Sequence, residues 1–216
     1  MSSSKRVSEY QRLGEPEKFA YRRGDTCLVG VDEVGRGPLA GNVVAAAVSL
    51  PETLPECLSE LNDSKKLTEK KRLYLARLII RHAVSYGVNS VSPTEIDQLN
   101  IFQATFVAMR GAVHKTVQRL HRSPDLVFVD GKFVIPNLEF EQMAIIKGDR
   151  LSLNIAAASI LAKVVRDRQM VVASKDFPEY GFEQHKGYGT RAHRQALKDF
   201  GPTPLHRRSF KWRAPE

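Results

Sequence analysis

The stretch that decides the fold reads Cys27-Leu28-Val29-Gly30-Val31-Asp32-Glu33-Val34-Gly35-Arg36-Gly37-Pro38-Leu39-Ala40-Gly41. Its first five residues predict a short buried strand. Two carboxylates, Asp32 and Glu33, follow this strand directly, and three glycines and a proline make the remainder a loop. A second, valine-rich strand is predicted from Asn42 to Leu50, so the stretch reads as a hairpin with carboxylates at its turn.

Outside this hairpin, short apolar runs alternate with segments of helical spacing. Ser92-Pro93-Thr94-Glu95 is typical of a helix start, with Ser92 as the N-cap and Glu95 reaching back to it. This order of elements predicts an α/β fold in which a mixed sheet carries helices on its faces. The predicted helices span 68–85, 92 to about 122 with a break near Asn100, and 152–172, and the further strands span 86–91, 126–129 and 143–146.

Length and composition restrict the class of protein. The chain has 216 residues, of which 42% are hydrophobic and 26% charged, as in a globular protein with a sizeable core. Its apolar runs are too short to cross a membrane and its N-terminus lacks a secretory signal, so we expect a cytoplasmic protein. Cys27 and Cys57 have no Cys or His at metal-ligand spacing, which argues against a disulfide scaffold or a zinc site.

Positive charge is concentrated near the C-terminus. The chain has 33 Lys and Arg against 24 Asp and Glu, and His185 to Arg213 alone holds eight basic residues and one acid, +7 of the net +9. Aromatic residues interleave with these basic ones. The pattern indicates a nucleic-acid-binding surface, with a solvated basic tail as the alternative that charge leaves open. Glycines and prolines predict an appendage of turns and short helix over 176–216, after a main domain over 27–175 and an N-terminal extension over 1–26.

Carboxylates follow three of the predicted strands. Asp32 and Glu33 follow the first, Asp130 follows Leu126 to Val129, and Asp149 comes shortly after the strand near Ile146. Four carboxylates brought together would repel one another, and divalent cations with oxygen ligands, such as Mg²⁺ or Mn²⁺, relieve that repulsion. Taken singly, each of these carboxylates is more readily explained as a turn former or helix cap. Together with the basic segment, they indicate a metal-dependent nuclease.

The glycine loop suggests a rival interpretation. Gly35 to Ala40 fits a loose dinucleotide-binding fingerprint. Such a turn leads into a helix, whereas Asn42 to Leu50 reads as a strand that ends at Pro51. A hairpin context argues against a nucleotide cofactor.

The segment from Gly30 to Gly41 closely resembles the signature of bacterial ribonuclease HII. The resemblance extends over about residues 27 to 210 and implies a ribonuclease H-like mixed sheet flanked by helices, with a C-terminal helical appendage. Further motifs of the family follow in its order: Asp63-Ser64-Lys65-Lys66-Leu67, Val129-Asp130-Gly131, Lys147-Gly148-Asp149, Ala156 to Val164, and His185-Lys186-Gly187-Tyr188-Gly189-Thr190.

The resemblance also implies an activity and its residues. The implied enzyme hydrolyses the RNA strand of RNA–DNA hybrids and incises duplex DNA 5′ of an embedded ribonucleotide, at the RNA–DNA junction, leaving 3′-hydroxyl and 5′-phosphate ends. It would use Mn²⁺ or Mg²⁺, with two ions in the active site. The implied catalytic, metal-binding residues are Asp32, Glu33, Asp130 and Asp149. The implied substrate contacts are Gly35, Arg36 and Gly37 at the ribose 2′-hydroxyl, Tyr188 against the following deoxyribose, and Ser64, Lys65 and Lys186.

Other polar residues are expected to play lesser parts. We expect Asp167 to form a structural ion pair, and His185, His193 and His206 to be phosphate contacts or surface residues rather than catalytic bases. We expect a monomer acting on RNA–DNA hybrids, and the sequence does not decide whether a sliding clamp recruits it. The competing hypothesis, a nucleic-acid-binding module without catalysis, is disfavoured because clustered acids without metal would repel phosphate.

Overall fold

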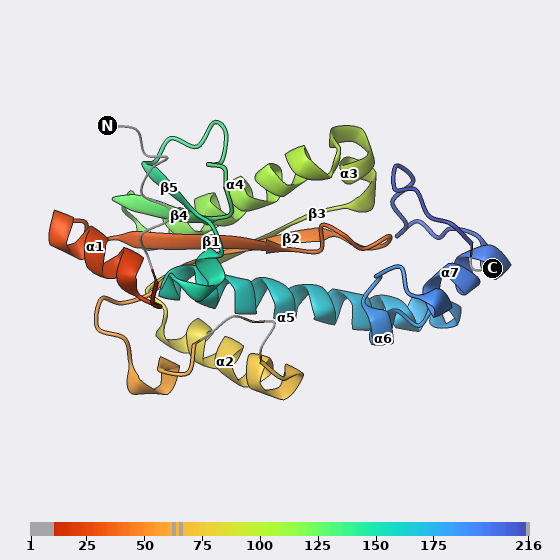
Figure 1. The fold of residues 1–216 in the computed structure, drawn as a ribbon, viewed down its shortest axis with the longest axis horizontal. Coiled ribbons are helices and arrows are strands. Elements are labelled where there is room, and N and C mark those ends of the chain that lie inside the picture. The colour runs from red at the N-terminus through yellow and green to blue at the C-terminus, as the bar shows by residue number, and fades with distance from the viewer. Residues whose placement is uncertain (1–10, 62–63, 65–66, 215–216) are drawn as a thin grey trace.

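The central element of the protein is a five-stranded mixed sheet with strand order β3-β2-β1-β4-β5 (Figure 1). The computed structural model describes residues 11–61, 64 and 67–214. β1 pairs antiparallel with β2, and β2 pairs antiparallel with β3, whereas β4 runs parallel to both β1 and β5. The predicted mixed sheet is therefore confirmed. Its strands are β1 (Leu28–Val34), β2 (Val43–Ser49), β3 (Ser85–Val91), β4 (Leu126–Asp130) and β5 (Gln142–Ile145).

Helices cover both faces of this sheet, with α3 and α4 on one side and α2 and α5 on the other (Figure 1). The predicted capping box at Ser92 is present, and Asn100 ends α3 with a φ of 68° while its side chain caps α4. The elements besides the strands are α1 (Glu15–Arg23), η2 (Glu56–Leu58), α2 (Glu69–His82), α3 (Pro93–Leu99), α4 (Ile101–Leu120), η4 (Gly148–Arg150), α5 (Leu153–Asp176), η5 (Pro178–Tyr180), α6 (Phe182–His185) and α7 (Arg191–Phe200).

The start of α5 lies directly against β1. A Cβ atom added to Gly30 would lie 2.3 Å from the backbone of Asn154 and Ile155, so only glycine permits this approach. Glu17 of α1 joins the same region, because its Oε1 accepts hydrogen bonds from the Ser152 hydroxyl and the Asn154 amide. α5 is therefore fixed at one end by β1 and α1, and its other end extends toward the C-terminal segment.

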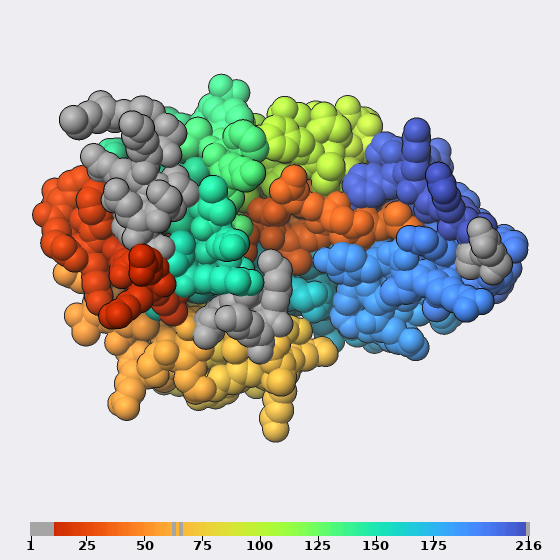
Figure 2. Space-filling view, in the orientation of Figure 1, coloured from red at the N-terminus to blue at the C-terminus, as the bar shows by residue number. Residues whose placement is uncertain are grey.

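The C-terminal segment packs on the far end of α5 and on the loop between β1 and β2. Ala40 from that loop shares an apolar cluster with Met170 of α5 and with Phe182 and Leu197 of the segment. Figure 2 shows the C-terminal residues in blue beside the orange β1–β2 region. Within the described residues, no helix is both long and apolar enough to span a membrane.

The expectation that His193 and His206 lie on the surface or contact phosphate is wrong. Both side chains are buried, and their Nε2 atoms lie 2.9 Å apart in a shared hydrogen bond. His185 stacks on His193 with ring centroids 4.5 Å apart. The buried face of α7 places His193 beside the rings of Tyr180 and Phe182, so the two histidines form part of the core of the segment. The ion pair expected for Asp167 is present, with Lys163 at 2.8 Å.

Candidate active site

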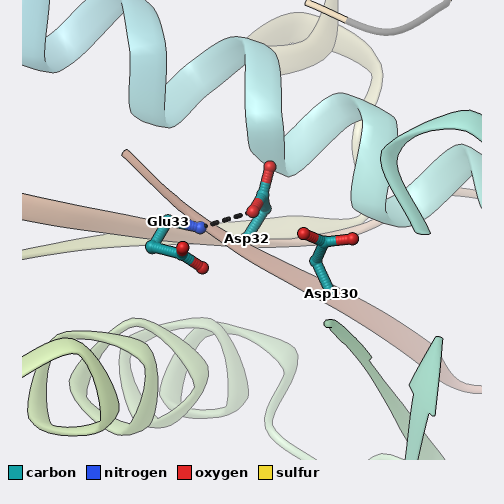
Figure 3. Close-up of side chains that lie close together, drawn as sticks. All are labelled: Asp32, Glu33 and Asp130. Carbon is teal, nitrogen blue, oxygen red and sulfur yellow. Dashed lines mark hydrogen bonds between the residues drawn. The ribbon is translucent and has the colours of Figure 1, made fainter. Parts of the chain in front are cut away.

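Three carboxylates meet where β1 and β4 end. Val31 of β1 pairs in parallel with Val129 of β4, so the next residues along the strands, Asp32 and Asp130, lie side by side. Glu33 follows on β1. One carboxylate oxygen from each of Asp32, Glu33 and Asp130 lies within 4.8 Å of the others (Figure 3). Adjacent parallel strands thus bring together residues that are about a hundred positions apart in the chain.

The two neighbouring acids on β1 share one cleft, and Glu33 also reaches a second pocket. Successive side chains of a strand point to opposite faces. Asp32 lines a cleft of about 300 Å³ on the α5 side, together with Ser64, Ser159, Lys163 and Tyr188. Glu33 and Asp130 also reach that cleft, and both border a second pocket under α4 that is lined by Phe102, Phe106 and Phe133. Glu33 and Asp130 therefore lie at the boundary between the cleft and the second pocket.

Burial and mutual repulsion make the ionised cluster unfavourable. Burial is the main cause that raises the pKa of Asp32 well above its usual value, with further contributions from the charges of Asp130 and Glu33. Burial, followed by the charges of Glu33 and Asp149, raises the pKa of Asp130 to about 6, although the Gly148 amide donates a 2.7 Å hydrogen bond to its Oδ1. Positive charge near these acids comes from Arg36, whose guanidinium lies 3.5 Å from Glu33, and from Lys163, which lines the same cleft.

Asp149 lies beside this cluster rather than within the group of three. It is buried in the short turn η4, which follows β5. Its charge contributes to raising the pKa of both Asp32 and Asp130, so it is close enough to act on them electrostatically. The structure thus brings together three of the four predicted carboxylates and places the fourth next to them.

The donor set of the cluster fits a hard divalent cation. All the available ligand atoms are carboxylate oxygens, which Mg²⁺ and Mn²⁺ prefer, whereas zinc favours nitrogen and sulfur. A bound cation would also stabilise the ionised forms of Asp32 and Asp130, which burial disfavours. The residues present are therefore suited to bind such an ion.

The loop between β1 and β2 presents its tip beside the cleft. Gly35 is buried, whereas Arg36 and Gly37 are exposed, and the Arg36 guanidinium lies 3.5 Å from Glu33. Among the described residues, none accepts a hydrogen bond from the backbone amide of Arg36 or of Gly37. Two neighbouring donors at an exposed tip are suited to bind an acceptor on a ligand.

The fold places different steric demands on the two glycines that flank Arg36. Gly35 has a φ of +92°, and an added Cβ would lie 2.2 Å from Nε of Arg166, so the fold itself requires glycine. A Cβ on Gly37 would meet only Cε1 of Tyr188, at 3.9 Å, which is ordinary contact. The folded protein without ligand therefore does not require glycine at position 37.

Tyr188 lies next to this loop tip. Its side chain is 44% exposed and lines the cleft that holds Asp32 and Asp130. The ring also lies 5.9 Å from the guanidinium of Arg166, within the range of a cation–π contact. The predicted sensor residues Gly37 and Tyr188 are thus neighbours, although they are far apart in the sequence.

The other predicted substrate contacts, Ser64, Lys65 and Lys186, differ in where they lie relative to the cleft. Ser64 is buried in the cleft wall, where its hydroxyl lies 2.6 Å from that of Ser159. The Lys186 ammonium donates to the carbonyl of Glu183, and Lys186 does not line the cleft among the described residues. Lys65 lies outside the described residues. Ser64 is therefore the one of these three that the structure places at the carboxylates.

Four residues of this region were not predicted as site residues. Ser159 and Lys163 line the cleft, and Arg166 and Arg207 are buried behind the loop. The first three share one side of α5, since spacings of four and three residues recur on a helix face, and that periodicity was readable in the sequence. No local pattern marks Arg207, which looks like one more basic residue of the C-terminal segment.

Comparisons with known proteins agree with this geometry. A family model for ribonuclease HII matches residues 29–213. The ribonuclease HII of Vibrio vulnificus (strain YJ016) is 51% identical over 193 residues, which are 89% of this chain and 90% of that protein.

Two solved structures share the fold over most of both chains. The ribonuclease H2 of Pyrococcus horikoshii OT3 has a TM-score of 0.71 at 28% identity and covers 86% of this chain and 94% of its own. The ribonuclease HII in the PCNA complex from Archaeoglobus fulgidus also has a TM-score of 0.71, at 27% identity, with 88% and 98% covered.

Three findings lead to one conclusion: the family model matches residues 29–213, carboxylates group toward the ends of β1 and β4, and half of the aligned positions are identical to those of a relative. The protein belongs to the ribonuclease HII family, metal-dependent endoribonucleases that act on RNA–DNA hybrids.

Proposed function

We propose that this protein cuts at the junction between RNA and DNA, incising duplex DNA 5′ of an embedded ribonucleotide as well as hydrolysing the RNA strand of hybrids. One observation carries the proposal. The amides of Arg36 and Gly37, to which no described residue offers an acceptor, lie with the ring of Tyr188 beside the cleft that holds the carboxylates. A site for reading a sugar and a site for hydrolysis thus adjoin.

The loop tip is the proposed sensor of ribose. The 2′-hydroxyl is the group that distinguishes RNA from DNA, and it can accept a hydrogen bond from a backbone amide. The exposed Gly37 lets the backbone approach the sugar, because a side chain there would occupy the space beside Tyr188. The amides of Arg36 and Gly37 therefore bind the 2′-hydroxyl of the ribonucleotide.

Tyr188 is the proposed sensor of the next sugar. An aromatic ring packs well against a deoxyribose, which lacks the polar 2′-hydroxyl, and less well against a ribose. The ring lies within van der Waals reach of the loop tip, as the 3.9 Å from the Gly37 Cβ position indicates. The two sensors together select a ribonucleotide followed by a deoxyribonucleotide.

Asp32, Glu33, Asp130 and Asp149 are the proposed ligands of two divalent ions, Mg²⁺ or Mn²⁺. When bound, such ions activate water as the nucleophile and stabilise the leaving oxygen of a phosphodiester. The protein holds its acids at the rim of the cleft, and no histidine is needed as a base there. Cleavage by this route leaves 3′-hydroxyl and 5′-phosphate ends.

The basic C-terminal segment is the proposed binding surface for the phosphate backbone of the duplex. Its exposed cations include Arg191, Arg194 and Lys198 on α7 and Arg208 and Lys211 beyond it. Lys186 and Lys65 are proposed contacts of the same kind. Contacts with phosphates add affinity without sequence preference, as a general hybrid nuclease requires.

The test compares four duplexes: DNA with one ribonucleotide, a uniform RNA–DNA hybrid, all-DNA and all-RNA. We expect metal-dependent cleavage of the first two, with a single cut 5′ of the embedded ribonucleotide, and extension by a DNA polymerase identifies the 3′-hydroxyl. Asp130→Asn is the matched inactive control. Cleavage of the hybrid with no cut at the embedded ribonucleotide would refute the junction assignment while leaving the family activity in place.

We further propose that the protein acts as a monomer in the cytoplasm. Light scattering coupled to gel filtration and cell fractionation test these two points. The relative from Archaeoglobus fulgidus was solved with PCNA. Recruitment of this protein by a sliding clamp stays a prediction, which co-elution with the clamp would test.

A further inference from the structure

Two buried arginines, Arg166 of α5 and Arg207 of the C-terminal segment, donate hydrogen bonds to the backbone of the β1–β2 loop. Arg166 has no exposed surface and Arg207 retains 3%. Among the described residues, no carboxylate forms an ion pair with either guanidinium. Asp167, the acid next to Arg166, pairs with Lys163 instead. Backbone carbonyls accept the hydrogen bonds of both guanidiniums, and an aromatic ring lies near each, Tyr188 at 5.9 Å from Arg166 and Phe210 at 5.0 Å from Arg207.

All the hydrogen bonds that these guanidiniums donate go to backbone carbonyls. Arg207 donates from Nη2 to Gly35, from Nη1 to Arg36 at 2.9 Å, and from Nε to Gly41 at 3.0 Å. It thus spans the two ends of the loop. A buried charge is expensive to desolvate, and an apolar side chain would fill the same space at lower cost. What an apolar residue could not do is hold three carbonyls in place.

Holding these carbonyls sets the direction of the neighbouring amides. A trans peptide is planar, so its C=O and the following N–H point in opposite directions, and the described chain has no cis peptide. The Gly35 carbonyl shares its plane with the Arg36 amide, and the Arg36 carbonyl shares its plane with the Gly37 amide. When Arg207 binds both carbonyls, both amides are turned away from it, to a side where no group of the described residues accepts them.

Arg166 connects the loop to the segment that carries Tyr188. Its guanidinium donates from Nη2 to Ala40 at 3.1 Å and from Nε to Asn42 at 3.0 Å, both in the loop, and from Nη1 to Lys186 at 2.9 Å. The same group lies 5.9 Å from the centre of the Tyr188 ring. One side chain thus fixes the distance between the two halves of the sensor.

We propose that Arg207 and Arg166 are positioning residues of the junction sensor: Arg207 orients the amides that bind the 2′-hydroxyl, and Arg166 holds the loop in register with Tyr188. The inference rests on the proposed function, since it assigns these amides and this ring to substrate. Lysine cannot replace either residue, because one ammonium cannot bind three carbonyls in a fixed plane.

The test of Arg207 measures the contribution of the 2′-hydroxyl to binding. Affinities for DNA with one ribonucleotide and for the same all-DNA duplex are measured in the Asp130→Asn background, so that both substrates stay intact. We expect Arg207→Lys to reduce the preference for the ribonucleotide by about five- to tenfold, the effect of one or two hydrogen bonds, with all-DNA affinity unchanged. An unchanged preference in a folded Arg207→Lys protein would overturn the role of Arg207.

The test of Arg166 is a double-mutant cycle with Tyr188. The readout is the ratio of kcat/KM on the embedded ribonucleotide to kcat/KM on the uniform hybrid. Arg166→Lys and Tyr188→Ala should each reduce this ratio several-fold, and the double variant should lose no more than either alone, because both remove one coupled contact. Independent, multiplicative losses, or an equal loss on both substrates, would overturn the role of Arg166.

Controls separate these effects from misfolding and from failure of the proposed function. Arg168→Lys changes an exposed arginine on the same helix and should leave both ratios at wild-type values. Thermal unfolding establishes a temperature at which each variant is folded. If a lysine variant does not fold, Arg207→Gln and Arg166→Gln are measured in its place. A wild-type protein with no preference for the ribonucleotide would refute the proposed function itself, whatever the variants do.

Discussion

Alanine at Gly35 and at Gly37 should have opposite consequences, although the two glycines flank the same arginine. At Gly35 the added Cβ would lie 2.2 Å from Nε of Arg166 and 2.7 Å from the Asn42 carbonyl, in a backbone with a φ of +92°. Strain of this kind costs about 1–3 kcal/mol, and overpacking against fixed neighbours costs a similar amount. We therefore expect Gly35→Ala to destabilise the protein by about 2–5 kcal/mol, a fall of roughly 4–20 °C in Tm for a chain of this size.

Gly37→Ala should leave the fold intact and impair catalysis. Its Cβ would meet only Tyr188, at 3.9 Å, and Gly37 is not among the glycines with positive φ. Its Tm should stay within about 2 °C of wild type, since replacing a glycine at a compatible position is neutral or mildly stabilising. A methyl group between the loop and the sugar should displace the amide from the 2′-hydroxyl and reduce kcat/KM by roughly 10- to 100-fold, or about 1.5–3 kcal/mol.

The assay pairs differential scanning fluorimetry with initial rates on DNA containing one ribonucleotide. We expect the two variants to differ: the variant at position 35 loses stability, and the variant at position 37 loses activity without losing stability. Wild-type turnover by Gly37→Ala would refute the assignment of this loop tip to substrate. Equal losses of Tm in both variants would refute the steric distinction between the two glycines.

Three further predictions concern the metal site, the basic segment and the buried histidines. Asp130→Asn should abolish cleavage, and near-normal turnover in Mg²⁺ would contradict the metal assignment. In EDTA the variant should unfold at an equal or higher temperature than wild type, because the substitution removes one charge from a buried, mutually repelling cluster while Oδ1 can still accept the hydrogen bond from the Gly148 amide. Arg194→Gln and Lys211→Gln should each reduce the slope of log K against log salt by about 0.9 if each contacts one phosphate. Point substitutions are preferred here because removing the segment would also remove Arg207 and the apolar cluster on α5. An unchanged slope in both variants would assign the segment to a solvated tail. Burial lowers the pKa of His193 and of His206 from 6.5 to about 4. As pH falls from 6.5 toward 4, the unfolded chain therefore takes up protons before the folded protein does, and folding stability is lost. A His193→Gln variant whose Tm falls as steeply as that of wild type over this range would exclude this source of acid sensitivity.

Features that depend on nearby residues were predictable from the sequence. The capping box at Ser92 and the helix break at Asn100 are made by groups within three positions of each other, and both are present. The apolar runs up to Val31 and Val129 predicted the two strands that carry Asp32 and Asp130, although β1 does not stop at Val31 and continues through Asp32 and Glu33 to Val34. The meeting of those two acids was predicted from their matching positions after apolar runs, and the parallel pairing of β1 with β4 brings it about, because parallel strands place their carboxyl ends at the same edge.

The environment of single polar side chains was not predictable in the same way. His193 and His206, in a segment rich in basic residues, were expected to contact phosphate or lie at the surface, yet each is covered by rings from α6 and η5. Arg207 was counted among the phosphate-binding cations, yet its guanidinium is bonded to the loop carbonyls. A hydropathy pattern reports the average of a segment and does not report the one residue that turns inward.

By itself, the sequence determined the order of helices and strands, the mixed sheet, the grouping of the carboxylates and, through its motifs, the family. Only the tertiary structure decided which glycine of the loop serves the fold and which can face a ligand, and which arginines hold the loop. The physical reason is the distance in sequence between partners: Arg207 bonds to Gly41, 166 positions away, and Arg166 bonds to Asn42, 124 positions away. Contacts of that kind arise when folded elements pack, and no local pattern of residues encodes them.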